Sequence, residues 1–172
     1  MDQHIETRKN RGNDMPKISL LPYTKERVHE FYKQYIYDPM IFSKDSDIKS
    51  YIYSKPLVDD YYENKVLDPT RHYFAICLDD KTIGEIQIKY IDFKKRCGTL
   101  SVALVNDSVK GHGYGTQAER LMIDYAFKSL GLLTLYADAV LRNRRSQHVL
   151  EKLGFLYTHE DDMLRYYVLH RY

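Results

Sequence analysis

Three glycines separated by single residues stand between a segment typical of a buried strand and a segment typical of an amphipathic helix. They are Gly111, Gly113 and Gly115, with the strand pattern over 99–105 and the helical pattern over 116–130. Glycine backbones can converge on a ligand because no Cβ intervenes, and a helix N-terminus carries partial positive charge. The order strand, glycine loop, helix therefore predicts a site for an anion, most simply a phosphate.

Other phosphate-binding motifs fit this loop less well. A dinucleotide-binding fold places Gly-x-Gly-x-x-Gly after its first strand, with an acidic residue about 20 positions further on. Here the last spacing is one residue shorter, and no Gly-Lys-Ser/Thr follows as in nucleotide hydrolases. Taken alone, the glycine triplet is also compatible with a tight turn between a strand and a helix.

Hydrophobic periodicity assigns the remaining elements. Residues 1–16 are polar and without periodicity, which predicts a flexible N-terminal arm, and 17–172 then form a single domain. The patterns predict strands at 18–21, 72–78, 82–91, 99–105, 132–140, 155–158 and 163–169, and helices from 24 and over about 43–53, 58–66, 116–130 and 144–153.

This order of elements predicts the fold class. A meander of strands followed by strand, helix, strand, helix and strand is typical of an α/β (α+β) fold. We expect a mixed, mostly antiparallel central sheet of about seven strands with helices on both faces.

Charge and composition exclude several functions. The 26 basic and 24 acidic residues give a net charge of +2, which is too small for a general nucleic-acid binder. No apolar run approaches the ~20 residues of a membrane helix, and no signal peptide is recognisable. Cys77 and Cys97 lack ligand-type companions, which predicts no metal site and a reducing compartment. Together these features predict a cytoplasmic protein with no metal, no membrane and no nucleic-acid partner.

A second motif follows the glycine loop at 143–155, ending in Val-Leu-Glu-Lys-Leu-Gly-Phe. Together the two motifs resemble the GNAT superfamily of acyl-CoA-dependent N-acyltransferases, and more closely its branch typified by the ribosomal-protein N-terminal acetyltransferases. In the superfamily motif Arg/Gln-x-x-Gly-x-Gly/Ala, Lys110, Gly113 and Gly115 fill the defined positions, with lysine as a departure. The resemblance covers about 18–172.

The resemblance implies a cosubstrate and where it binds. Acetyl-CoA would donate an acetyl group directly to a primary amine, without a metal. The pantetheine arm would lie between splayed strands at 102–105 and 136–140, along the edge formed by Leu104 and Val105. The backbone N–H of Val105 would stabilise the oxyanion. The pyrophosphate would bind the loop residues Lys110, Gly111, His112, Gly113, Tyr114, Gly115 and Thr116.

The resemblance also suggests catalytic residues. Many GNAT enzymes have a tyrosine acid seven residues after the asparagine, but Leu150 occupies that position here. The ribosomal-protein branch is thought to use a serine three residues after the asparagine, which makes Ser146 the proton donor and Asn143 a cofactor or water contact. The alternative is that Asn143 and Ser146 only cap a helix, as these residue types often do.

The general base is less well defined. Relatives often carry a glutamate early in the fourth strand, where this chain has Leu100, so Glu85 on the preceding strand is the nearest candidate. Glu85 shares its strand face with Gln87 and Lys89 and is alternatively a solvated side chain. A water chain or Glu160 would then do the same work.

The acceptor side is suggested by aromatic and acidic residues. Eight of the 17 tyrosines fall between Tyr23 and Tyr62, where they favour core packing over an amine-binding groove. Acidic groups at 59–63 and 160–162 either attract a cationic acceptor or lie in solvated turns. We expect a protein N-terminal amine or a small amine as acceptor, with a homodimer also typical of the family. The alternative function is a non-catalytic acyl-CoA-binding module.

Overall fold

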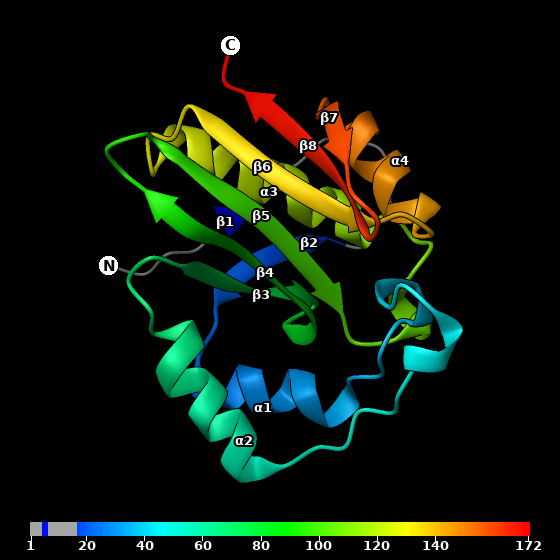
Figure 1. Cartoon of the computed structure of the whole chain (residues 1–172). Helices are drawn as coiled ribbons and strands as arrows, with labels where there is room; N and C mark the ends of the chain where they lie inside the picture. The colour runs from blue at the N-terminus through cyan, green and yellow to red at the C-terminus, as the bar shows by residue number, and fades with distance from the viewer. Residues whose placement is uncertain (1–4, 7–16) are drawn as a thin grey trace.

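A single sheet with helices on both faces organises residues 5–6 and 17–172, which the computed structural model describes (Figure 1). The strand order is β1-β2-β3-β4-β5-β6-β8-β7. The strands are β1 (Ile5–Glu6), β2 (Ile18–Pro22), β3 (His72–Leu78), β4 (Lys81–Asp92), β5 (Cys97–Leu104), β6 (Thr134–Val140), β7 (Leu156–Glu160) and β8 (Leu164–His170). The α-helices are α1 (Lys25–Gln34), α2 (Lys55–Tyr61), α3 (Tyr114–Lys128) and α4 (Arg144–Lys152).

Every pair of neighbouring strands in this sheet is antiparallel except β5 with β6. The predicted mixed, mostly antiparallel sheet is therefore confirmed, with the two-residue β1 as the eighth strand. The predicted flexible arm at 1–16 falls largely outside the described residues. Of that segment the structure describes only β1, which pairs with β2.

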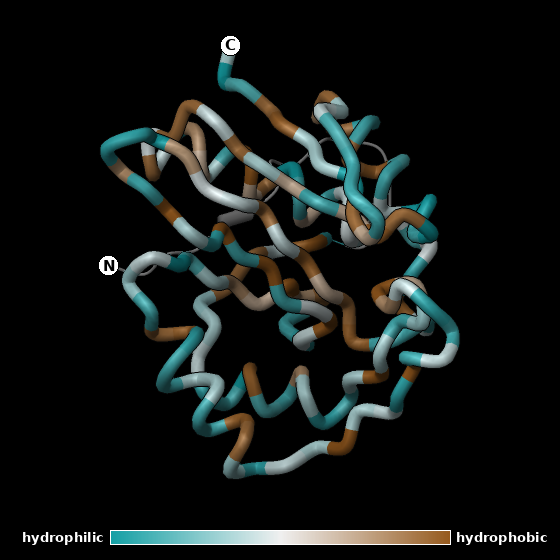
Figure 2. The backbone as a smooth tube through the Cα atoms, viewed as in Figure 1, coloured by the Kyte–Doolittle hydropathy of each residue, from teal (hydrophilic) through white to brown (hydrophobic). Residues whose placement is uncertain are grey.

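The sheet separates two hydrophobic cores. The larger core lies under α3 and α4 and includes Ile86, Ile88 and Met122. The smaller lies under α1 and α2 and includes Val28 and Phe31. Residues alternate between the faces of a strand, so the middle of β4 supplies Ile86 and Ile88 to the first core and directs Glu85 to the other face. Figure 2 shows hydrophobic segments recurring along the central strands and on the helices that cover them.

The predicted helix at 43–53 is wrong. The structure has two short 3₁₀ turns, η1 (Pro39–Ile41) and η2 (Asp45–Asp47), and no regular element from 48 to 54. A short helix needs an apolar face packed on a core, but Ile52 is 82% exposed. Ile48 and Ile52 of this segment are exposed, and only Tyr53 packs against the smaller core.

The helix predicted at 58–66 is present but begins at Lys55 and continues as the π-helical turn η3 (Tyr62–Val66). The other helices and strands lie within a few residues of their predicted limits. Among the described residues, none of the helices combines the length and apolarity needed to span a membrane.

Candidate active site

The two parallel strands of the sheet separate along their length. The β5–β6 pairing covers only Cys97–Thr99 opposite Thr134–Tyr136. Beyond these residues β5 keeps its partner β4 and β6 keeps β8, so the carboxyl halves of β5 and β6 diverge (Figure 1). The predicted splay between 102–105 and 136–140 is thus present.

Of the two residues predicted to form the open edge of β5, Leu104 has its N–H on the open side and Val105 does not. The N–H of Val105 donates to the carbonyl of Ile83 at 2.9 Å, so it points toward β4 and away from the splay. The expectation that this N–H stabilises an oxyanion is therefore wrong. Because backbone groups alternate along a strand, the N–H groups of Val102 and Leu104 face the open side.

A cavity of about 80 Å³ lies where the strands begin to separate. Ser146 from α4 and Glu119 from α3 both line it, so the cavity joins residues from two helices and both strands. Its remaining walls are Lys89, Leu100, Ser101, Val102, Ala137, Asp138 and Leu150. The predicted catalytic serine therefore faces the splay.

The glycine loop opens α3 as predicted, and the helix begins at Tyr114. Gly111 and Gly113 have φ of +81° and +79°, a left-handed conformation that favours glycine, and a Cβ at either would meet nothing within 4 Å. Gly113 is the N-cap and has no side chain to accept the first-turn N–H groups. Open space, exposed amides and the α3 dipole fit the pyrophosphate of an acyl-CoA.

The two charged residues of the loop have different surroundings. The Lys110 ammonium donates to Asp38 at 2.8 Å and to Asp107 at 2.9 Å, and it is mostly buried. Lys110 therefore fastens the loop to the segment after α1, and its charge is already balanced by two carboxylates. His112 is exposed and stacks on Tyr114, with 5.3 Å between ring centroids.

Asn143 caps α4. Its Oδ1 accepts the N–H of Ser146 at 3.1 Å, which is the capping role weighed for this residue. The cap uses the backbone of Ser146 and not its hydroxyl, so the Ser146 side chain stays directed by the helix toward the cavity that it lines. Of the two residues weighed as caps, Asn143 caps the helix and Ser146 does not.

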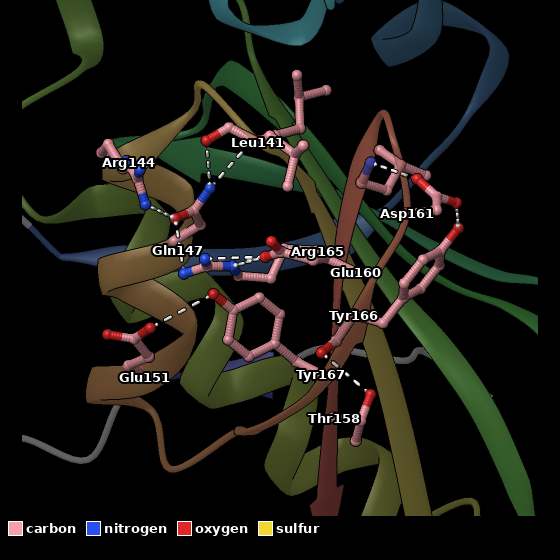
Figure 3. Close-up of polar contacts among 12 residues, drawn as sticks. Leu141, Arg144, Gln147, Glu151, Thr158, Glu160, Asp161, Arg165, Tyr166 and Tyr167 are labelled. Carbon is pink, nitrogen blue, oxygen red and sulfur yellow. Dashed lines mark hydrogen bonds and ion pairs between the residues drawn. The ribbon is translucent and has the colours of Figure 1, made fainter.

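Gln147 holds α4 against the end of β6 (Figure 3). Its Nε2 donates to the carbonyls of Val140 and Leu141 at 3.1 and 2.9 Å, and its side chain is only 3% exposed. Arg144 donates to its Oε1 at 3.1 Å. Sequence reasoning missed Gln147, although a polar residue next to the candidate acid and on the buried side of a helix is a usable signal.

Glu85 lies on the face covered by α1 and α2, among tyrosine hydroxyls. Tyr23 donates to it at 2.7 Å, Tyr61 at 3.2 Å and Tyr32 at 3.5 Å. Burial raises the pKa of the Glu85 carboxyl to about 7, although these hydrogen bonds act in the opposite direction. The alternative that Glu85 is a solvated side chain is therefore wrong.

The clustered tyrosines belong largely to the core. Of the eight between Tyr23 and Tyr62, Tyr23 is buried and five others pack against the smaller core. The predicted preference for packing is confirmed, but the hydroxyls that enclose Glu85 give the same residues a polar role. The sequence offered no signal for that arrangement, because the tyrosines lie 24 to 62 positions from Glu85.

The acidic groups are engaged locally. Asp59 binds Lys55 at 2.7 Å and His29 at 2.9 Å. Glu160, the alternative base, forms an ion pair with Arg165 at 2.9 Å (Figure 3). These contacts favour a structural role over attraction of a cationic acceptor. Within 5–6 and 17–172, no group of His, Cys, Asp and Glu side chains has the arrangement of a metal site.

Fold and site together define a class of protein. A mixed sheet that splays at its parallel pair, beside a glycine loop that opens the next helix, is the architecture of GNAT acetyltransferases. The family described as Acetyltransferase (GNAT) domain matches residues 13–156, and the chain belongs to this family.

The chain has relatives that are similar in sequence and others that are similar in structure. The chain is 33% identical over 100 residues to the probable N-acetyltransferase YjcK of Bacillus subtilis (strain 168), a match to 55% of this chain and 53% of YjcK. A crystal structure of a probable acetyltransferase superposes with a TM-score of 0.72 at 21% identity, over 92% of this chain and 94% of the other. The dodecameric spermidine N-acetyltransferase of Vibrio cholerae gives 0.68 at 16% identity, over 92% and 95%. At these identities the structural matches show the fold.

Proposed function

We propose that this chain is an acetyl-CoA-dependent N-acetyltransferase that transfers an acetyl group directly from the thioester to a primary amine. The observation that carries the proposal is that the splay of β5 and β6 opens next to the glycine loop and contains Ser146. Membership of the acetyltransferase family supports the same chemistry.

Backbone groups would hold most of the cosubstrate. The amides of 111–116 and the N-terminus of α3 would bind the pyrophosphate, as they suit an anion. The free amides of Val102 and Leu104 would bond the pantetheine arm as a further strand bonds a sheet edge. Asn143 uses Oδ1 as a cap, which leaves its Nδ2 to donate to the cosubstrate.

Three chemical steps would follow from the positions of the side chains. Glu85, as a carboxylate, would take a proton from the acceptor ammonium so that the amine attacks the thioester carbonyl. A free amide of the open β5 edge would stabilise the oxyanion. Collapse of the tetrahedral intermediate breaks the C–S bond, Ser146 would give its proton to the sulfur, and the nitrogen would release its remaining extra proton to water to give the neutral amide.

The acceptor class would be a protein N-terminal amine or a small amine. The tyrosine hydroxyls and rings around Glu85 suit an ammonium group that loses its proton there. The motif resemblance favours ribosomal-protein-type N-termini, and several structural neighbours are spermidine N-acetyltransferases. We also propose that this chain forms a homodimer; one structural neighbour, the spermidine N-acetyltransferase of Vibrio cholerae, is dodecameric.

Release of free thiol from acetyl-CoA tests the proposal. The full chain is assayed with N-terminal peptides, spermidine and an aminoglycoside, against a control without amine. We expect release that depends on the amine and a product of one added acetyl group by mass spectrometry. Binding of acetyl-CoA by calorimetry without any release would support the non-catalytic module, and absence of binding would refute the role of the glycine loop.

A further inference from the structure

Glu119 is a buried carboxylic acid in the middle of α3. Its residue is 5% exposed, and within the described part of the chain its Oε2 has no hydrogen-bond partner. A buried polar atom without a partner costs free energy, and such atoms are few in folded proteins. The cost at Glu119 therefore calls for a ligand or a chemical role at this position.

The cavity at the splay gives Glu119 access to the candidate acid. Glu119 and Ser146 both line this space of about 80 Å³, although they belong to different helices. A polar cavity of this size is large enough for at least one water molecule, which needs two or more polar partners. A water between the two side chains can connect them by hydrogen bonds.

A serine needs help to protonate a thiolate. A thiol has a pKa of roughly 8.5, whereas a serine hydroxyl is a far weaker acid. If Ser146 gave its proton to the leaving sulfur alone, it would be left as an alkoxide, which is a stronger base than the thiolate that it protonated. The transfer becomes favourable only when the Ser146 oxygen gains a proton from a stronger acid at the same time.

We propose that Glu119 is this stronger acid and resupplies the proton of Ser146 through a water in the cavity; the inference rests on the proposed function. As the C–S bond breaks, the proton of Ser146 goes to the sulfur, and the water replaces it while taking the proton of the Glu119 carboxyl. Glu119 ends as a carboxylate and regains a proton from solvent once the products have left.

The surroundings of Glu119 suit this role. Burial raises the pKa of its carboxyl to about 7, which makes it a stronger acid than a thiol and keeps it largely protonated up to neutral pH. The charged groups that share the cavity are Lys89 and Asp138. The apolar residues that line the same cavity are Leu100, Val102, Ala137 and Leu150.

A double-mutant cycle tests the coupling. We expect Glu119→Gln to lower kcat by roughly 10²-fold, since that is typical of a lost acid, and to leave acetyl-CoA affinity within about twofold. In a Ser146→Ala background, Glu119→Gln has no further effect, because the acceptor of its proton is gone. Glu151→Gln removes a carboxyl of α4 outside the cavity and leaves kcat unchanged.

The pH dependence separates this role from a structural one. The kcat of the wild type falls above neutral pH as Glu119 loses its proton, and Glu119→Gln lacks this decline. In the ligand-free protein, carbon-13 NMR of labelled glutamate should show two carboxyls that titrate near pH 7, those of Glu85 and Glu119. One of the two should vanish in Glu119→Gln, and thermal melting confirms that the variant is folded.

Two results would overturn the inference. They are a Glu119→Gln variant with wild-type kcat and pH profile, or a loss that adds fully to that of Ser146→Ala. If Ser146→Ala itself keeps full turnover, the acid assigned under the proposed function is wrong and the relay falls with it. If Ser146→Ala is impaired but Glu119→Gln is not, only the relay is refuted.

Discussion

Asn143 shows at the scale of a residue why part of this site is readable from sequence. Its cap on Ser146 depends on a spacing of three residues, and the same spacing places Ser146 on the cavity side of α4. Such short spacings can be recognised in the sequence alone. The direction of the Val105 N–H and the tyrosines around Glu85 depend on strand register and on helices folding over the sheet, so no local pattern revealed them.

Glu119 lies between these cases. It stands on one side of α3 with Met122 and Ala126, at the i, i+3, i+7 spacing of a buried helical face. A carboxylate on that face was therefore visible as an anomaly in the sequence. Its neighbour across the cavity was not, because Ser146 follows 27 positions later on another helix.

The base role of Glu85 predicts a pH dependence. A carboxyl with a pKa of about 7 is ionised above neutral pH, so Glu85 should give kcat/KM a limb that rises through about 7, opposite to the decline assigned to Glu119. The rising limb is therefore measured in the Glu119→Gln background, which lacks that decline. Tyr23 donates the 2.7 Å hydrogen bond that favours the carboxylate, so Tyr23→Phe should raise the pKa and move the rise to higher pH. Steady-state kinetics between about pH 5.5 and about pH 9, in steps of about one unit or finer, measure the shift.

Glu85→Gln is the companion variant, because it removes the base and keeps the shape. We expect kcat/KM to fall by roughly 10²-fold or more with acetyl-CoA affinity preserved. A Glu85→Gln enzyme that retains the wild-type pH profile would show that water or another group accepts the proton.

At the scale of elements, segments whose apolar face packs on the sheet follow their sequence pattern, and a segment whose apolar face is exposed departs from it. Strand β3 has the predicted limits, whereas the isoleucines of the helical face predicted in 43–53 are exposed. Periodicity records which side chains are apolar. Whether a neighbouring surface exists to bury them is a property of the assembled fold.

The glycine loop supplies a prediction at this scale. Gly113→Ala forces an L-residue into φ of +79°, at a cost of about 1 kcal/mol, or a shift of the amides that face the ligand. If the free loop relaxes by moving these amides and binding has to restore them, acetyl-CoA affinity falls by up to about fivefold, which corresponds to that energy. Calorimetric titration of the folded variant measures the change.

Gly131→Ala is the matched control. Gly131 has φ of +68° beyond the other end of α3, and a Cβ there would meet its nearest neighbour at 3.8 Å. The strain is therefore similar, but the site is remote from the loop. Both variants should lose similar thermal stability, and only Gly113→Ala should bind acetyl-CoA more weakly. Equal affinity in the two would argue against ligand contact by the loop.

At the scale of the whole molecule, strand β5 has amides that face the gap and amides that face β4, so one group can serve as the control for the other in a ligand-binding experiment. The amides of Val102 and Leu104 face the open side of β5, while those of Ala103 and Val105 face β4. If the pantetheine arm bonds to the open edge, acetyl-CoA should slow hydrogen exchange at Val102 and Leu104 far more than at the other two. Residue-resolved exchange by NMR measures this, and equal slowing at all four would contradict the proposed placement.

The splay also has a mechanical consequence. The short pairing of Cys97–Thr99 with Thr134–Tyr136 is where the β1–β5 part of the sheet is hydrogen-bonded to the β6–β8 part. We expect so narrow a connection to let the two parts of the sheet move relative to each other, limited by the core that α3 shares with both. A ligand lying between β5 and β6 would contact both parts of the sheet. We therefore expect ligand binding to reduce the motion of the two parts relative to each other and to make the entire domain more rigid.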